Sequence, residues 1–187
     1  MEEDQERKII NCKYIPVRKT LKVNNIKEGE QDEVTVVEKT KQEKGFYLEE
    51  LIFTASLKLP GLVHSFREND IKKHFNESSL NGIDHLIKIG ETNILLQDKW
   101  KESHNQQEVS QFLNCCSRIQ ERLGTTVQLI WASKCTPTKN SLKMLKERKV
   151  HILVSDNMEE LANSVIKKIL EMVSDDIMKG IHSSVLK

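Results

Sequence analysis

The chain has 187 residues, of which 30% are charged, and its formal net charge at neutral pH is +1. This length suffices for one domain of ordinary size with a tail. The near-neutral charge excludes a polycation, so any nucleic-acid surface must come from local clusters of basic residues. The four cysteines include no C-x-x-C pair, which argues against a structural zinc site and for reduced thiols. The acidic amino terminus and the lack of a membrane-length apolar run predict a soluble intracellular protein without membrane contact.

Residues 1–44 differ in pattern from the rest of the chain and are interpreted as an N-terminal extension. Apolar residues partly alternate over residues 8–23, as in a half-exposed strand, and a second β-branched patch covers residues 34–37. The acidic stretch between these patches contains a glycine and suits a turn. The pattern leaves two alternatives open, a β-hairpin docked on the main domain or a disordered tail.

From Gly45 onward, hydrophobic periodicity predicts regular elements in chain order. Helices are expected over residues 45–59, 68–75, 109–123, 139–148 and 158–173, and strands over residues 86–89, 93–96, 127–132 and 151–154. Pro60 ends the first helix, Gly124 ends the third, and a tight turn at residues 90–92 joins the first two strands. Because strands alternate with helices after this hairpin, the sequence predicts an α/β domain over residues 45–187 whose later strands are joined by crossovers.

The predicted hairpin places three polar residues at one end. Asp84 stands at the start of its first strand, and Gln97 and Lys99 stand at the end of the second. Folding about the turn brings these two ends side by side. Side chains alternate across a strand, so Gln97 and Lys99 project to one face while Asp98 projects away.

A carboxylate, an amide oxygen and an ammonium on one face suit phosphodiester hydrolysis. The carboxylate of Asp84 would hold Mg²⁺ or Mn²⁺, with the amide oxygen of Gln97 and the backbone carbonyl of Asp98 as further ligands. The ammonium of Lys99 would orient water and stabilise developing negative charge. The alternative interpretation is an ordinary strand end at which polar residues meet solvent, because a D…(E/Q)-x-K pattern is common.

The order of motifs along the chain resembles a known superfamily. The motifs are Gly45-Phe46-Tyr47-Leu48-Glu49, Asn81-Gly82-Ile83-Asp84 and Leu96-Gln97-Asp98-Lys99-Trp100, followed by a strand, a helix and a strand over residues 127–133, 139–145 and 150–156. They resemble the first-helix signature, the glycine-containing turn and the Q-x-K strand of the Mrr-type branch of PD-(D/E)xK restriction endonucleases.

This resemblance implies a three-layer α/β/α sandwich with a central mixed sheet, and Mg²⁺-dependent cleavage of DNA with Glu49 as an accessory metal residue. Two features depart from the family. Residues 61–79 are less strand-like than the family's first strand, and glutamine at position 97 removes one metal-binding charge. By analogy with paired active sites on duplex DNA, a homodimer is expected.

Basic residues cluster between the third and the fourth predicted strands. If the nuclease interpretation holds, the expected DNA contacts are Lys101, Lys134, Lys139 and Lys143, together with Trp100 stacking on a base or sugar. The alternatives are a solvated helix face for the lysines and half-buried packing for the tryptophan. His85, His104 and His151 show no triad or metal spacing and are interpreted as structural or surface residues.

The sequence therefore favours a metal-dependent DNA endonuclease centred on Asp84, Gln97 and Lys99. One rival is a nuclease-fold module that has lost catalysis and acts in DNA binding or protein assembly. Another is a structural protein whose core imitates the motif.

Overall fold

The structure is a computed structural model that describes residues 40–185. The predicted pattern of the N-terminal extension falls on residues 1–39, outside the described residues, so hairpin and tail both remain predictions. The first described helix, α1, spans Lys41–Ser56 and thus begins before the predicted domain boundary at residue 45. A capping box between Thr40 and Glu43 fixes its start.

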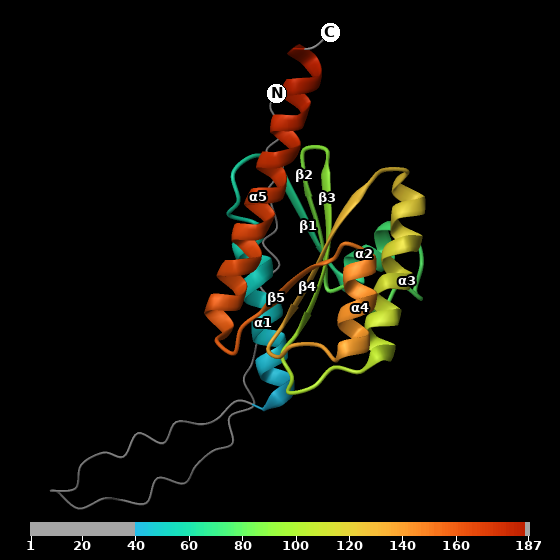
Figure 1. Cartoon of the computed structure of the whole chain (residues 1–187), viewed down its shortest axis with the longest axis vertical. Helices are drawn as coiled ribbons and strands as arrows, with labels where there is room; N and C mark the ends of the chain where they lie inside the picture. The colour runs from blue at the N-terminus through green and yellow to red at the C-terminus, as the bar shows by residue number, and fades with distance from the viewer. Residues whose placement is uncertain (1–39, 186–187) are drawn as a thin grey trace, which may run out of the picture. The chain divides into compact units, whose positions relative to one another are not determined.

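Five strands form one mixed sheet in the order β1-β2-β3-β4-β5 (Figure 1). The strands are β1 (Val63–Arg67), β2 (His85–Ile89), β3 (Thr92–Lys99), β4 (Val127–Ser133) and β5 (His151–Val154). β2 pairs antiparallel with both β1 and β3, whereas β3, β4 and β5 are parallel to one another. Helices α3 (Gln106–Leu123) and α4 (Lys139–Glu147) form the crossovers that the sequence predicted.

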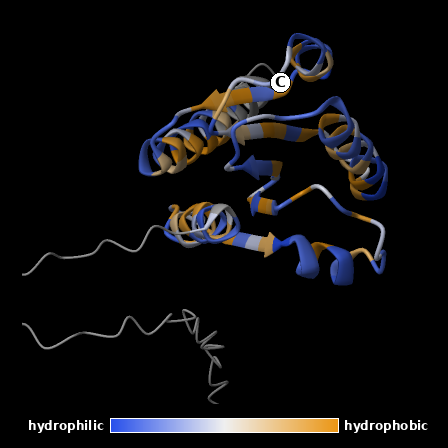
Figure 2. Cartoon of the chain, turned by 90° about the horizontal axis from the view of Figure 1, so that it is seen from below, coloured by the Kyte–Doolittle hydropathy of each residue, from blue (hydrophilic) through white to orange (hydrophobic). Residues whose placement is uncertain are grey.

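Helices cover both faces of the sheet (Figure 1). Helices α1 and α5 (Met158–Val185) pack on one face, and α3, α4 and the short α2 (Glu68–His74) pack on the other. Seen from below, the helices on either side of the strands carry both hydrophobic and hydrophilic residues (Figure 2). These residues are segregated to opposite sides most clearly on α3 and α4, as expected of helices that pack one side on a sheet. This architecture confirms the predicted three-layer α/β/α sandwich with a central mixed sheet.

Alternation along β3 decides which way its polar end points. Leu95 belongs to the core on the α3 side, while Ile94 and Leu96 belong to the core on the α1 side. Continuing this alternation, Gln97 and Lys99 lie on the α3 side and Asp98 lies on the α1 side. The strand is buried over almost its whole length, so its last residues are held rigidly between two layers.

The turn before Asp84 is shaped by a close approach of α3. Gly82 has φ +95°, a conformation that L side chains rarely adopt, and a Cβ there would lie 3.3 Å from Cγ of Gln111. Helix α3 is itself fixed by a capping box between Asn105 and Glu108. The glycine of the predicted motif therefore lets the chain enter β2 directly beneath α3.

One strand, β1, was not predicted from the sequence. Residues 61–79 were expected to be less strand-like, yet Val63–Arg67 forms β1 and pairs with β2 along its whole length. Its five residues are only partly buried because β1 is an edge strand, and therefore they lack the continuous apolar run of an inner strand. In the part of the chain described by the structure, no helix has the length and apolar character needed to cross a membrane.

Candidate active site

The candidate site lies where β2 begins and β3 ends. Ladder pairing places His85 opposite Leu96, so Asp84 comes opposite Gln97, and its backbone N–H donates to the Leu96 carbonyl at 3.0 Å. Gln97 and Lys99 project from β3 toward the same α3 side as Asp84. The predicted convergence of these three residues is therefore present in the structure.

All three donors of the site meet at a single carboxylate oxygen. Oδ2 of Asp84 accepts hydrogen bonds from the side-chain amide of Gln97, from the backbone N–H of Asp98 at 2.9 Å, and from the Lys99 ammonium at 3.4 Å. Gln97 is almost fully buried, whereas the side chains of Asp84 and Lys99 keep 13% and 28% of their surface exposed. The group is thus anchored on the inside and open to solvent on the outside.

The carboxyl of Asp84 has a strongly altered proton affinity. Burial, followed by the negative charge of Asp98, raises the pKa of Asp84 from its usual 3.8 to about 7. The Lys99 ammonium, the Asp98 amide and His85 oppose this change. A bound cation would favour the ionised form, so this carboxyl is placed to exchange a proton for a positive ligand near neutral pH.

The oxygen atoms in and around Asp84 suit a hard cation as ligands. The carboxylate of Asp84, the carbonyl oxygen of Gln97 and the backbone carbonyl of Asp98 are all oxygens, which Mg²⁺ and Mn²⁺ prefer. The Gln97 amide nitrogen lies 3.4 Å from that backbone carbonyl, and a half-turn of the amide would bring its oxygen there instead. Within residues 40–185, no three His, Cys, Asp or Glu side chains are grouped to hold a metal, so the site offers one carboxylate and neutral oxygens.

The side chain of Asp98 points away from this site, as the sequence predicted. Its carboxylate accepts a hydrogen bond from the His85 ring at 3.0 Å on the α1 side of the sheet. Asp98 therefore contributes its backbone atoms to the site, and its side-chain charge acts on Asp84 from the opposite face of the sheet. The hydrogen bond between His85 and Asp98 was not predicted from the sequence, in which His85 was interpreted as a structural or surface residue.

Glu49 lies across the sheet from Asp84. It is half-buried on α1, and among the described residues no hydrogen bond or ion pair joins it to Asp84, Gln97 or Lys99. Burial raises the pKa of Glu49, and the negative charge of Asp98 raises it further. The structure thus groups Glu49 with Asp98, and its role as an accessory metal residue stays a prediction.

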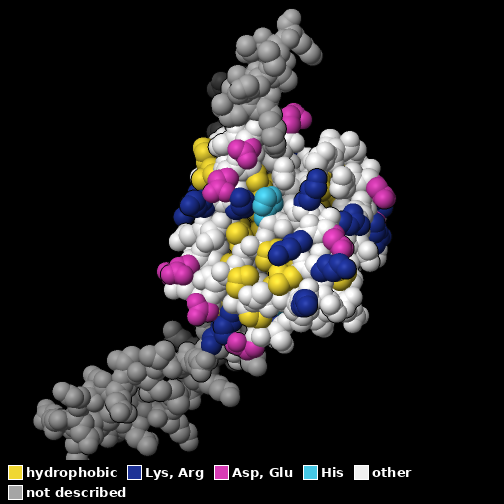
Figure 3. Space-filling model, in the orientation of Figure 1, with side chains coloured by type: hydrophobic (Ala, Val, Ile, Leu, Met, Phe, Trp, Pro, Cys, Tyr) yellow, Lys and Arg dark blue, Asp and Glu magenta, His cyan; other side chains and the backbone are white. Residues whose placement is uncertain are grey.

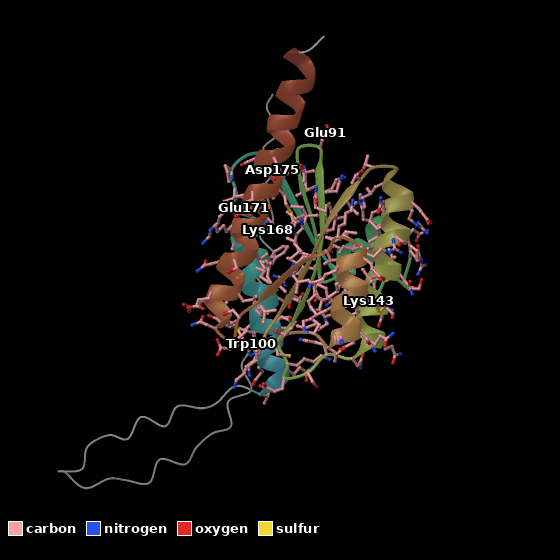
Figure 4. The ribbon with its side chains drawn as sticks, in the orientation of Figure 1. Glu91, Trp100, Lys143, Lys168, Glu171 and Asp175 are labelled. Carbon is pink, nitrogen blue, oxygen red and sulfur yellow. The ribbon has the colours of Figure 1, made fainter. Side chains whose placement is uncertain are left out.

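Three of the five predicted DNA contacts are engaged within the protein. Lys101 pairs with Glu108, and Lys134 pairs with Glu102. Trp100 is half-buried against the core on the α1 side (Figure 4), in line with the packing alternative, and the Lys134 ammonium lies 5.9 Å from its ring centroid. Any contact of these residues with a ligand must compete with these partners.

The other two predicted contacts are exposed on α4. Lys139 begins this helix, and Lys143 projects from it beside Glu147 with 3.9 Å between the charged atoms (Figure 4). On the visible face of the molecule, Lys and Arg side chains predominate over α3 and α4, whereas acidic side chains are more frequent over α5 (Figure 3). The basic surface and the Asp84 site therefore share one side of the sheet.

His104 borders the site in the loop between β3 and α3. It is buried with its ring edge-on to Trp131 at 5.7 Å, and Trp131 is the β4 partner of Gln97. Burial lowers the pKa of His104, the charge of Glu108 raises it, and nearby lysines including Lys99 lower it.

A hollow of about 530 Å³ lies elsewhere, around the end of α2, and no predicted site residue lines it.

Comparisons with known proteins find distant structural likeness only. No family model matches the chain, and no curated protein matches it. One similar solved structure is that of an EndoMS–dsDNA2 complex, with 19% identity, a TM-score of 0.44, and coverage of 66% of this chain and 48% of that chain. Another is a repair endonuclease from Pyrococcus abyssi, with 16% identity, a TM-score of 0.43, and coverage of 64% and 49%. This chain spans about half the length of each.

Proposed function

We propose that the chain is a metal-dependent DNA endonuclease with a restriction endonuclease-like fold. The observation that carries the proposal is the convergence on one oxygen of Asp84 of the Lys99 ammonium, the Gln97 amide and the Asp98 backbone N–H. Such a group of one acid, one amide and one ammonium at a strand end suits metal-assisted phosphodiester hydrolysis. The resemblance of the motifs to PD-(D/E)xK enzymes supports the same reaction.

Mg²⁺ or Mn²⁺ would be held by the carboxylate of Asp84, the amide oxygen of Gln97 and the backbone carbonyl of Asp98. When bound, the ion neutralises charge on the phosphate and activates water. Oδ2 of Asp84 already accepts three hydrogen bonds, and among the described residues Oδ1 accepts none. Oδ1 is therefore the oxygen that Asp84 offers to the ion.

Lys99 would act on the substrate directly. Its ammonium lies 3.4 Å from Asp84 and remains partly exposed, so it can donate to a phosphate oxygen without leaving the site. Negative charge on that oxygen grows as the phosphate is attacked, and a fixed ammonium stabilises this charge more in the transition state than in the ground state. Loss of Lys99 would therefore lower turnover more than binding.

DNA would approach from the side of α3 and α4. β3 and β4 are parallel, so the loops that follow their carboxyl ends lie at the same edge of the sheet, and the second loop leads into α4. Exposed Lys139 and Lys143 on this helix can reach backbone phosphates near the site. Contacts of this kind supply sequence-independent affinity that weakens as salt is added.

The test is a cleavage assay on linear, supercoiled and branched DNA with Mg²⁺ or Mn²⁺. We expect the unaltered chain to cleave only with added divalent ion, and Asp84→Ala to abolish cleavage. Asp175→Ala removes an exposed carboxylate on α5 and should cleave normally. Light scattering in the presence of DNA reports whether the active species is the expected homodimer. Equal cleavage by the Asp84 variant would overturn the proposal.

A second function is favoured by one observation. The side-chain nitrogen of Gln97 faces Asp84, so the described site is satisfied by internal hydrogen bonds. This arrangement suits a module that binds DNA or another protein without cleaving. DNA affinity without cleavage under any divalent ion, unchanged in Asp84→Ala, would favour this function, while neither affinity nor cleavage would favour a structural role.

A further inference from the structure

A second polar cluster lies directly behind the candidate active site, on the α1 face of the sheet. His85 follows Asp84 in the chain, and Asp98 is the middle residue of the Q-x-K sequence. Both side chains project toward α1, where the His85 ring stacks on Phe53 with 6.5 Å between ring centroids. Arg67 covers the outer side, with its guanidinium 4.0 Å from the Phe53 ring centroid.

His85 and Asp98 form a closed pair. Nε2–H of His85 donates to Oδ2 of Asp98 at 3.0 Å, and the two side chains are 0% and 5% exposed. The other ring nitrogen of His85 has no hydrogen-bond partner among the described residues. The pair is therefore held by one hydrogen bond and by packing, without access to bulk solvent.

Stability alone gives no reason for a polar pair at this place. The apolar side chains Ile87, Ile94, Leu96 and Ala132 form the core on this face. Half-buried Glu49 on α1 adds a carboxyl whose pKa is raised by burial and by the charge of Asp98, so that charge is unfavourable here. A buried carboxylate is unfavourable unless it is paired, and replacing a buried polar pair with apolar residues is often neutral or stabilising. A leucine pair would suit this core at least as well, so the polar pair points to another role.

The pair extends the connection between β2 and β3 beyond their ladder. The last Cα partners of these strands are His85 and Leu96, and residues 97–99 pair only with β4. Past this point, Asp84 is joined to β3 by its own N–H and by the Asp98 N–H that donates to its carboxylate. The hydrogen bond from His85 to Asp98 fixes the residue that supplies this donor.

We propose that the buried His85–Asp98 pair positions Asp84. The pair holds Asp98 from the α1 face so that its backbone N–H stays directed at Asp84 Oδ2 on the opposite face. Both members are positioning residues, because they act through the main chain and do not touch the substrate. Their effect on cleavage rests on the proposed function, whereas their effect on the Asp98 amide does not.

The decisive variant is the double change His85→Leu with Asp98→Leu, which removes the pair without leaving a buried partner unsatisfied. We expect its melting temperature to stay close to that of the parent, while turnover falls between about 10-fold and 100-fold and DNA affinity is kept. Hydrogen exchange of the amide at residue 98 should become at least about 10-fold faster, and Mn²⁺ affinity measured by electron paramagnetic resonance should fall.

Two further variants separate positioning from packing. Ile87→Leu with Ile94→Leu changes a directly paired position on the same face and should leave every readout unchanged. His85→Gln keeps an N–H donor at similar reach and should restore protection of the amide at residue 98. If the double leucine variant folds less stably than the parent, the exchange rate of the amide at residue 98 is compared between His85→Gln and His85→Leu instead.

The outcomes distinguish this inference from the proposed function. A parent chain that cleaves no DNA overturns the endonuclease, while exchange at residue 98 still decides the role of the pair. Parent-like amide protection and Mn²⁺ affinity in the double leucine variant would overturn the positioning role, even where the parent cleaves DNA.

Discussion

The two faces of the β2–β3 end carry polar groups of opposite character. On the α3 side, Asp84 and Lys99 are partly exposed and linked at 3.4 Å. On the α1 side, His85 and Asp98 are buried and linked at 3.0 Å. Both groups use the same short stretch of backbone, since successive strand residues face opposite ways. One strand end can therefore present a solvent-accessible group, here called the open group, to a ligand. A buried group on the opposite face, here called the closed group, keeps the shared backbone in place.

The closed face should show the larger effect on stability. His85→Leu leaves the Asp98 carboxylate buried without its partner, so we expect the free energy of unfolding to fall by about 3–5 kcal/mol. Lys99→Leu removes a partly exposed pair and should lower it by less than about 1 kcal/mol. Urea unfolding of both variants measures the difference. Equal losses would show that the two faces are not distinct in this respect.

The open face should show the larger effect on chemistry. We expect Lys99→Ala to lower the cleavage rate by about 100-fold or more, because the ammonium acts when charge builds on the phosphate. Melting temperature and DNA affinity should stay near those of the parent. Lys88→Ala, at the other end of the hairpin, is the matched control. Undiminished cleavage by the Lys99 variant would remove this residue from the mechanism.

The pH dependence of stability should identify the open carboxyl. The pKa of Asp84 is raised from 3.8 to about 7, so between these values the folded chain binds more protons than the unfolded chain. Stability from this group is therefore present at low pH and lost as the pH rises through this window. In a chelating buffer, acidification from pH 7.5 to about 5.5 should raise the melting temperature of the parent relative to Asp84→Asn. A parallel pH profile of the two proteins would contradict the altered pKa.

The smallest effect is expected on the outer surface of α4. Lys143→Ala should weaken DNA binding several-fold and reduce the salt dependence of log affinity by about one unit. Lys167→Ala, at an exposed position of α5 on the other side of the sheet, should leave both unchanged. Titrations at several salt concentrations measure the slope. Identical slopes for the two variants would place the DNA surface away from α4.

The open group was predictable from the sequence and the closed group was not. Turn chemistry at residues 90–92 and strand alternation sufficed to bring Asp84, Gln97 and Lys99 together. The sequence did contain a signal that His85 and Asp98 form a pair, although this signal was not used. A charged residue inside a buried strand requires a partner, and the diagonal neighbour across the hairpin was a histidine.

Other features depend on contacts that no local pattern encodes. The pairing of Lys134 with Glu102 spans 32 residues, so a run of lysines did not reveal which of them are engaged within the protein. Strand β1 is an edge strand with only partly buried side chains, and its sequence therefore lacks the apolar pattern by which inner strands are recognised. The position of Glu49 follows from how α1 lies on the sheet. Apolar and polar residues are mixed around this helix, so its sequence did not specify that orientation.

The close approach of α3 to the turn at Gly82 also has a kinetic consequence. The β2–β3 hairpin closes over two residues, so its pairing is local and should form early in folding. The turn before Asp84 gains its contacts from distant residues: Gly82 lies against Gln111, and the Cys115 thiol donates to the Asn81 carbonyl across 34 residues. Closing that longer loop has a larger entropic penalty. We therefore expect the hairpin to form before Asp84 is placed, which makes the candidate active site one of the last regions to become ordered.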